Sequence, residues 1–351
     1  MSSVEMGFYP FADSTQPMMD YSDIEERVDT SYGRVKVSIY GDRSKEAIVT
    51  FHDVGLDADN NFQNFFQFGT VVEITEKFCV YNINAPGQEM DASPLGENYS
   101  YPSMDGLAQI VDTVVRHFRL TSFIGFGVGA GANVMLRYAI KYQEKLRALV
   151  LINADCGTAG WLEWAYARGN ISLLRSKGMN NLTVNHLMWH NFGKHEEQTD
   201  PEVIRQYRGF FLNHPNPGNL LLFMEAYLNR TEIVLQQPAN GATSTLNTPI
   251  LKVPILQLVG SRSAFLDETV NVNTKLDPAN TEWVKVSNAC GLVLDEKSEE
   301  VTESLLLFLQ GLGYFAHLNV RKAVDRLVNS KKGNQSNSCA METITEVDSS
   351  L

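Results

Sequence analysis

The chain has 351 residues, of which 44% are hydrophobic, so it is long enough to bury one large core. Its formal net charge of −12 argues against nucleic acid as a partner, because phosphate contacts need clustered Lys and Arg. No run of residues approaches the roughly 18–20 consecutive apolar residues that a membrane-spanning helix needs.

The first 30 residues are acidic and are interrupted by Pro10 and Pro17. Arg27 is their one basic residue, and the acidic residues are Glu5, Asp13, Asp20, Asp23, Glu25, Glu26 and Asp29. Segments rich in charge and poor in apolar residues cannot bury enough surface to become ordered. We therefore predict a loosely ordered acidic segment over residues 1–30.

From residue 31 to residue 155, short apolar runs alternate with amphipathic segments. The pattern predicts strands at 34–40, 47–51, 78–83, 123–126 and 149–153, and helices at 103–118 and after Gly131. The run at 149–153 is almost continuously apolar, which indicates a strand that is covered on both faces. Strands that alternate with helices at this spacing predict a parallel sheet.

The pattern changes near Asp155. Residues 156–245 contain only helical segments, at 161–168, 185–191, 203–213 and 220–234, and strand signals return at 255–259 and 283–286, before a helix at 298–312. The prediction is an α/β core of residues 31–155 and 246–318, interrupted by a helical cap of residues 156–245. This is the α/β-hydrolase fold, a mostly parallel, doubly wound sheet with an inserted cap over the carboxyl ends of its strands.

Such a fold holds its nucleophile at a strand-to-helix turn of the form G-x-S-x-G. The corresponding turn reads Gly127-Val128-Gly129-Ala130-Gly131, and two registers are open, with the nucleophile position at Gly129 or at Gly127. Both are glycines, and no Ser or Cys occurs between residues 123 and 141. Glycine tolerates the strained backbone of this turn and has no side chain that could attack a substrate.

The other two triad positions also lack the expected residues. Ser263 occupies the acid position, although Asp267 or Asp155 could supply a carboxylate from nearby. Leu292 occupies the base position, and no histidine occurs between His214 and His317. A hydrolytic triad needs a base beside its nucleophile, so the sequence predicts that the chain is not a hydrolase.

The turn could still form a pocket. The backbone amides of Ala130 and Gly131 begin a helix and favour an anion. His52 and Asp53 end an early strand where these folds place their second oxyanion donor, and together with Gly129 and Asp155 they complete the candidate pocket. Two interpretations remain, an inert and filled relic or a small-ligand site.

Other reactive residues carry weaker signals. His186 and His190, with His195 beyond them, could bind a metal, but no carboxylate or cysteine nearby completes a ligand set, so we expect a cap-helix surface and no metal or other cofactor. Cys290 lies near the missing base, and nothing beside it in the sequence would lower its thiol pKa.

The C-terminal residues 319–351 predict a basic helix followed by a disordered polar tail. The helix contains Asp325 and five basic residues, Arg321, Lys322, Arg326, Lys331 and Lys332. A solvated helix face is the simplest interpretation, and weak contact with anionic lipid is the alternative.

The cysteines and the N-terminus favour a cytoplasmic protein, with peripheral membrane contact left open. Cys79, Cys156, Cys290 and Cys339 are widely spaced, which suits a reducing compartment. The residues after Met1 lack the basic start and apolar run of a secretory signal.

Several segments resemble the N-myc downstream-regulated (NDRG) family. They are residues 81–88 (YNINAPGQ), 101–105 (YPSMD), 127–132 (GVGAGA), 149–154 (LVLINA), 216–220 (NPGNL), the pattern Gly157-x-x-Gly160-Trp161-x-x-Trp164, the pattern Asn273-x-Lys275-Leu276-Asp277-Pro278, and Cys290-Gly291.

The resemblance implies a non-catalytic branch of the α/β-hydrolase superfamily. It also implies a mainly cytoplasmic protein of signalling, stress-response and differentiation pathways. Leu292 and the short C-terminal tail depart from the family pattern. We therefore predict a non-enzymatic signalling or adaptor protein that binds protein partners. The alternatives are a cofactor-free enzyme that uses His52 with Asp53 or Asp155, and a small-ligand or lipid sensor.

Overall fold

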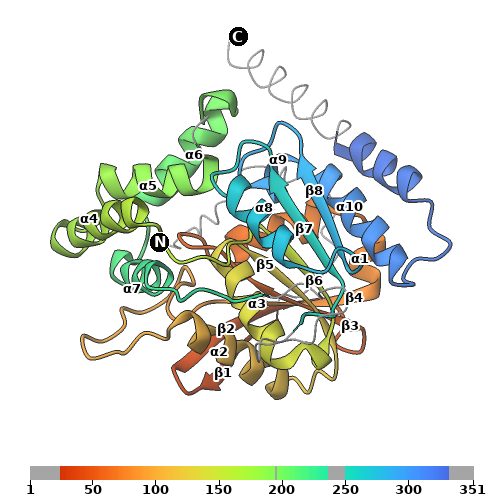
Figure 1. The fold of residues 1–351 in the computed structure, drawn as a ribbon, viewed down its shortest axis with the longest axis horizontal. Helices are drawn as coiled ribbons and strands as arrows, with labels where there is room; N and C mark the ends of the chain where they lie inside the picture. Colours follow the sequence, from red (N-terminus) through yellow and green to blue (C-terminus); the bar gives the residue numbers. More distant parts are fainter. Residues whose placement is uncertain (1–23, 194–195, 236–249, 332–351) are drawn as a thin grey trace, which may run out of the picture.

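A computed structural model describes residues 24–193, 196–235 and 250–331. Eight strands form one sheet in the order β1-β2-β4-β3-β5-β6-β7-β8 (Figure 1). Their bounds are β1 Ile24–Thr30, β2 Gly33–Tyr40, β3 Glu46–Phe51, β4 Phe78–Ile83, β5 Phe123–Val128, β6 Leu146–Ile152, β7 Ile255–Gly260 and β8 Thr281–Val286. In this order, each neighbouring pair of strands from β4 through β3 to β8 is parallel, whereas β2 pairs antiparallel with both β1 and β4.

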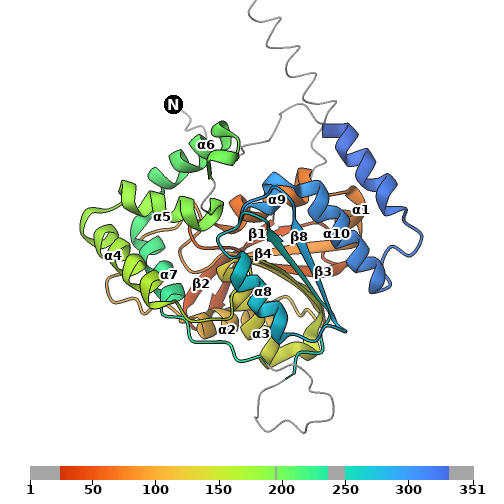
Figure 2. The same ribbon diagram turned by 45° about the horizontal axis from the view of Figure 1, so that its top comes forward.

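Helices cover both faces of the sheet, as the alternation of its buried side chains requires. In β5, Phe123 packs into the core on one face and Ile124 into the core on the other. One face carries α2 (Met104–His117), α3 (Ala130–Tyr142) and α8 (Leu266–Lys275), and the other carries α1 (Val72–Lys77), α9 (Val293–Glu296) and α10 (Ser298–Gly311) (Figure 2). The α/β-hydrolase architecture predicted from the sequence is therefore correct.

Four helices of the cap lie between β6 and β7. They are α4 (Trp161–Lys177), α5 (Asn181–Phe192), α6 (Pro201–Leu212) and α7 (Pro217–Leu228), and they form one group at the left of Figures 1 and 2. Asp200 and Asn216 begin α6 and α7, because each side chain accepts a backbone N–H of the first turn and Pro follows at the first helical position.

Part of the predicted acidic segment is ordered, so that prediction is wrong from Ile24 onward. β1 buries one apolar side chain, Val28, and its charged residues find partners instead. Arg27 pairs with Glu89 at 2.8 Å, and Glu26 pairs with His117 at 2.6 Å. Residues 1–23 lie outside the described residues, as do 332–351 of the predicted C-terminal tail.

The basic C-terminal segment is helical over residues 320–331. Val320, Ala323 and Leu327 are buried against the core on the α10 side of the sheet. In the part of the chain that the structure describes, no helix is long and apolar enough to cross a membrane.

Candidate functional site

The nucleophile position of the strand-to-helix turn is Gly129. β5 ends at Val128 and α3 begins at Ala130, so the register with Gly127 as nucleophile is wrong, since Gly127 lies within the strand. Gly129 has φ 54° and ψ −113°, a conformation that favours glycine. A β-carbon at Gly131 would lie 1.9 Å from the Phe51 carbonyl oxygen, so the turn packs directly on the end of β3.

Asp53 occupies the place where an anionic reaction intermediate would bind. Its Oδ1 accepts hydrogen bonds from the backbone N–H groups of Val54 at 2.7 Å and Ala130 at 2.8 Å. Its Oδ2 lies 2.9 Å from Nε2 of His190, which comes from the cap helix α5. Asp53 is only 3% exposed. The amides that would stabilise an oxyanion are therefore bound to a carboxylate of the chain itself.

The same carboxylate fills the space of the absent nucleophile. A β-carbon added to Gly129 would lie 2.1 Å from the carboxyl carbon of Asp53. Real β-carbons do not approach other heavy atoms to less than 3.0 Å. Asp53 and any side chain at residue 129 therefore exclude each other in this geometry.

His52 does not take part in this cluster, although it precedes Asp53. Its Nε2 accepts the N–H of Ala85 at 3.0 Å, so the ring proton lies on Nδ1, which donates to the Asp53 carbonyl oxygen at 2.8 Å. Burial lowers the pKa of His52 to about 4, which keeps the ring neutral. The imidazole beside the Asp53 carboxylate is that of His190, and the expectation that His190 lies on a cap surface is wrong.

The residues in the acid and base positions make structural contacts. Ser263 donates to Oδ1 of Asn153 at 2.9 Å, and Asn153 donates to the Gly291 carbonyl oxygen at 2.8 Å. Leu292 is 5% exposed and packs in the core. Asp267 is exposed, so it supplies no carboxylate to the buried cluster.

Asp155 is buried, and its carboxylate forms an ion pair with Arg230 of the cap. Its Oδ2 accepts a hydrogen bond from Nη2 of Arg230 at 2.7 Å, and its Oδ1 accepts from the N–H of Gly157 at 2.7 Å. Because both oxygens are engaged, Asp155 holds the start of the cap in place.

The Cys290 thiol is held in its protonated form. Its Sγ lies 3.1 Å from Thr199 Oγ1 and 3.3 Å from Glu296 Oε2. Burial and the nearby Glu296 carboxylate raise the pKa of Cys290 to about 12. The thiolate that nucleophilic or redox chemistry needs is therefore disfavoured.

A small cavity lies under the described part of the cap. This cavity of about 30 Å³ lies between α4, α5 and α7, and Val54, His186, His190, Arg230 and Phe265 contribute to its lining. That volume suits about one or two water molecules. His186 is mostly buried, and burial lowers its pKa to about 4. Among the described residues, which do not include His195, no three His, Cys, Asp or Glu side chains are grouped as metal ligands.

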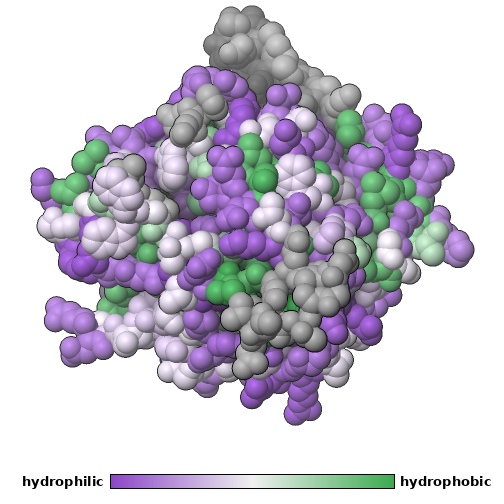
Figure 3. Space-filling view, in the orientation of Figure 1, coloured by the Kyte–Doolittle hydropathy of each residue, from purple (hydrophilic) through white to green (hydrophobic). Residues whose placement is uncertain are grey.

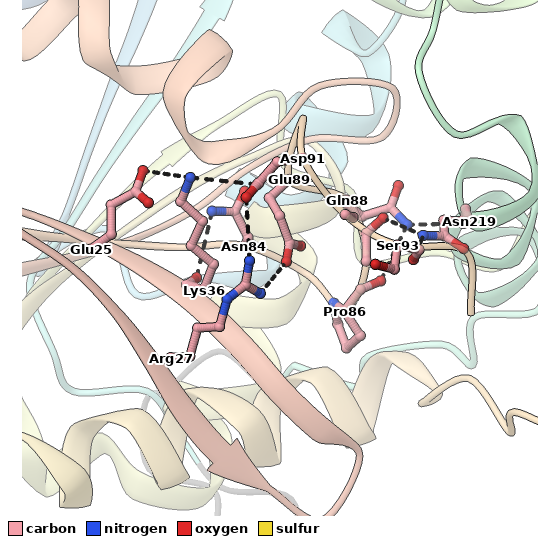
Figure 4. Close-up of polar contacts among 12 residues, drawn as sticks. Glu25, Arg27, Lys36, Asn84, Pro86, Gln88, Glu89, Asp91, Ser93 and Asn219 are labelled. Atoms are coloured by element: carbon pink, nitrogen blue, oxygen red, sulfur yellow. Dashed lines mark hydrogen bonds and ion pairs between the residues drawn. The ribbon is translucent and has the colours of Figure 1, made fainter. Parts of the chain in front are cut away.

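The cap is fastened to the core by the loop after β4 (Figure 4). Asn219 of α7 donates to the Gly87 and Ser93 carbonyl oxygens at 2.8 and 3.1 Å, and its Oδ1 accepts the N–H of Leu95 at 2.9 Å. Gln88 donates to the Asn219 carbonyl oxygen at 2.9 Å. These contacts hold α7 in a fixed position above the sheet.

The middle of the same stretch of the loop is held by the sheet edge, through Glu89 and Asp91 (Figure 4). Arg27 of β1 pairs with Glu89, which is 5% exposed. Lys36 of β2 lies 2.5 Å from Glu25 and 3.7 Å from Asp91. The loop thus connects the edge of the sheet to the cap.

The comparison of this sequence with protein-family models finds the Ndr family, over residues 25–316. Among curated relatives, the protein NDRG3 of Xenopus tropicalis is 34% identical over 309 residues, which are 88% of this chain and 78% of that protein. The protein NDRG4-A of Xenopus laevis is 35% identical over 292 residues, 83% of this chain and 72% of that protein.

Solved structures show the same fold at lower identity. A thermophilic esterase from Thermogutta terrifontis superposes with a TM-score of 0.65 at 18% identity, over 82% of this chain and 99% of the esterase. An enol-lactonase from Burkholderia xenovorans superposes with a TM-score of 0.62 at 15% identity, over 81% of this chain and 100% of the lactonase. The chain combines this hydrolase fold with a glycine turn closed by its own carboxylate, and by sequence it belongs to the Ndr family.

Proposed function

We propose that the chain is a non-enzymatic pseudo-hydrolase that acts as a cytoplasmic adaptor in signalling, stress response or differentiation. The observation that carries the proposal is the Asp53 carboxylate, which binds the Val54 and Ala130 amides and lies 2.1 Å from where a β-carbon of residue 129 would stand. Ester hydrolysis needs both of these places free, one for the oxyanion and one for the nucleophile.

Ester hydrolysis by the purified chain tests the first half of the proposal. Across p-nitrophenyl esters of two to twelve carbons, we expect rates equal to the buffer blank. An Asp53→Ala, His190→Ala double variant is the matched control for contaminating esterases. Turnover by the wild type that this control abolishes would establish an enzyme and refute the proposal.

The adaptor half is tested by affinity purification from the native cell with quantitative mass spectrometry. Asp53→Asn keeps the shape of the buried cluster and changes its charge. We expect the wild type and this variant to recover the same partners, because an adaptor binds through its surface. Recovery of no specific partner would refute the adaptor role. A set of partners that changes with Asp53 would instead favour a sensor.

The two alternative functions have less support. A cofactor-free enzyme that uses His52 would need a free ring nitrogen, and both nitrogens of His52 contact the backbone. A small-ligand sensor would need a larger cavity than about 30 Å³. Thermal shifts against a metabolite and lipid panel test the sensor, and we expect a flat response.

Contact of the basic helix with anionic lipid stays a prediction. Arg326 forms an ion pair with Glu73, and Lys331 pairs with Glu299 at 2.9 Å, so part of the positive charge is already matched. Arg321 and Lys322 lie on the exposed side of the helix, and Lys332 lies outside the described residues. Flotation with phosphatidylserine vesicles tests this prediction.

A further inference from the structure

The outward side of the cap helix α4 displays large aromatic side chains. Trp161 is 77% exposed, more than any other large hydrophobic residue among the described residues, and Trp164 and Tyr166 are 45% and 53% exposed. Tryptophan normally buries most of its surface. Exposed tryptophans beside one another therefore mark a surface that is covered in a complex.

Trp161 and Trp164 belong to one continuous stripe along the helix. Trp161, Trp164, Arg168 and Ser172 follow one another at intervals of three and four residues, and all of them are exposed. The guanidinium of Arg168 lies over the Trp164 ring, 5.9 Å from its centroid. We name this stripe, with the small residues Ala165 and Gly169 between its larger members, the α4 face.

The shape of the α4 face suits another helix. Ala165, Gly169 and Ser172 are small residues in its centre, and a β-carbon added at Gly169 would meet no atom within 4 Å. Another helix can pack closely along such a row of small residues, with the tryptophans at one end of the contact. Figure 3 shows side chains of intermediate hydropathy gathered over α4 and α5, next to strongly hydrophilic ones.

The charge of the α4 face points to an acidic partner. The helix α4 contains Arg168, Arg175 and Lys177 and one acidic residue, Glu163, although the whole chain has a net charge of −12. Arg175 already pairs with Glu225 at 2.6 Å, so Arg168 carries the positive charge beside the tryptophans. An acidic helix is small enough to meet mainly this local positive charge, whereas an extended anionic membrane surface would also face acidic parts of the chain around it.

We propose that the α4 face is the docking surface for an acidic amphipathic helix of a partner protein. This inference rests on the adaptor function proposed above and assigns it a surface and a class of partner. The partner helix would place its apolar side on Trp161 and Trp164 and its acidic flank beside Arg168. The buried Asp53 cluster takes no part in this contact.

The test uses the full chain with a photo-crosslinking benzoylphenylalanine at Ser172, in extract of the native cell, and sequences the crosslinked segments by mass spectrometry. We expect acidic amphipathic helices among those segments. Gly169→Glu should reduce their yield at least tenfold, because it adds bulk and negative charge to the centre of the α4 face. Gly209→Glu on α6 is the matched control, since Gly209 also has open space around it, and it should leave the yield unchanged.

Other outcomes overturn the inference. Equal yields from Gly169→Glu and Gly209→Glu would show that the α4 face is not the contact. Crosslinks to lipid, to residues 1–23 of the chain or to a second copy would identify a different occupant. If affinity purification recovers specific partners and Ser172 crosslinks to none of them, the adaptor function stands and the α4 face is wrong. If neither experiment finds a partner, both proposals fail.

Discussion

The exclusion between Asp53 and any side chain at residue 129 can be measured with a double-mutant cycle. Gly129→Ala would put a β-carbon 2.1 Å from the Asp53 carboxyl carbon. The Asp53 side chain must then move and lose its hydrogen bonds with two backbone amides and with His190. Hydrogen bonds to charged groups contribute about 1.5–3 kcal/mol each, and partial hydration of the freed groups leaves a loss of about 2–4 kcal/mol. The positive φ of residue 129 adds about 1–2 kcal/mol.

We therefore expect Gly129→Ala to lower the free energy of unfolding by about 3–6 kcal/mol in the wild type. In an Asp53→Gly background the carboxylate is absent, so the same change should cost only the backbone strain, about 1–2 kcal/mol. The coupling between the two positions is then about 2–4 kcal/mol. Guanidinium unfolding of the four proteins, followed by tryptophan fluorescence and circular dichroism, measures it.

Asp53→Asn is the control that separates shape from charge. An asparagine keeps the atoms that meet the β-carbon, so Gly129→Ala should remain strongly destabilising in that background. The exclusion would be refuted if Gly129→Ala lowered the free energy of unfolding by the same amount, within about 0.5 kcal/mol, in the Asp53→Gly background and in the wild type.

Three further predictions concern the pH dependence, the cap and the buried thiol. Burial raises the pKa of Asp57 to about 7, above its value of 3.8 in the unfolded chain, so the folded protein holds the proton and its stability decreases as pH rises from about 4 to about 7. The free energy of unfolding of Asp57→Asn, relative to that of the wild type, should increase by about 2 kcal/mol from pH 5 to pH 8. A difference between the two proteins that does not vary with pH contradicts this. Asn219→Ala should increase hydrogen exchange in α7, whereas Asn229→Ala at the exposed end of the same helix should not, and equal effects would show that the loop after β4 does not fasten the cap. Iodoacetamide at pH 8 should alkylate Cys290 at least about a hundredfold more slowly in the folded protein than in urea, because its pKa is raised to about 12, and comparable rates would contradict that shift.

The fold was predictable because its strands are short and strongly apolar. The run at 149–153 lies almost wholly in β6, and the alternation of strands and helices predicted the parallel sheet. β1 was not predicted, since it buries one side chain and its order depends on Arg27 and Glu26 pairing with residues more than 60 positions away. Such pairings leave no periodic signal in a local segment.

The sequence predicted the site only where the residue type at one position is enough to show that a catalytic group is missing. Gly129 and Leu292 lack the needed chemistry whatever surrounds them. The orientation of the Asp53 side chain depends on the Ala130 amide, 77 residues away, and on His190, 137 residues away. The one local signal was a carboxylate beside an expected oxyanion donor, which is an unusual place for a negative charge. The sequence could not show whether it turns toward the amides or toward solvent.

Restoring a serine at residue 129 should therefore fail for two separate reasons. Gly129→Ser meets the Asp53 carboxylate, so the single variant should be destabilised about as much as Gly129→Ala. Adding Asp53→Gly removes the collision and should restore most of the stability. The double variant should still not react with a fluorophosphonate probe, because Leu292 stands in the base position and His52 is bound to the backbone. The nearby His190 loses, with Asp53, the carboxylate that its ring contacts, and a base needs such a group to orient it. Labelling of the double variant would show that His190 or another group activates the serine. Labelling of a stable single variant would show in addition that Asp53 does not occupy the oxyanion position.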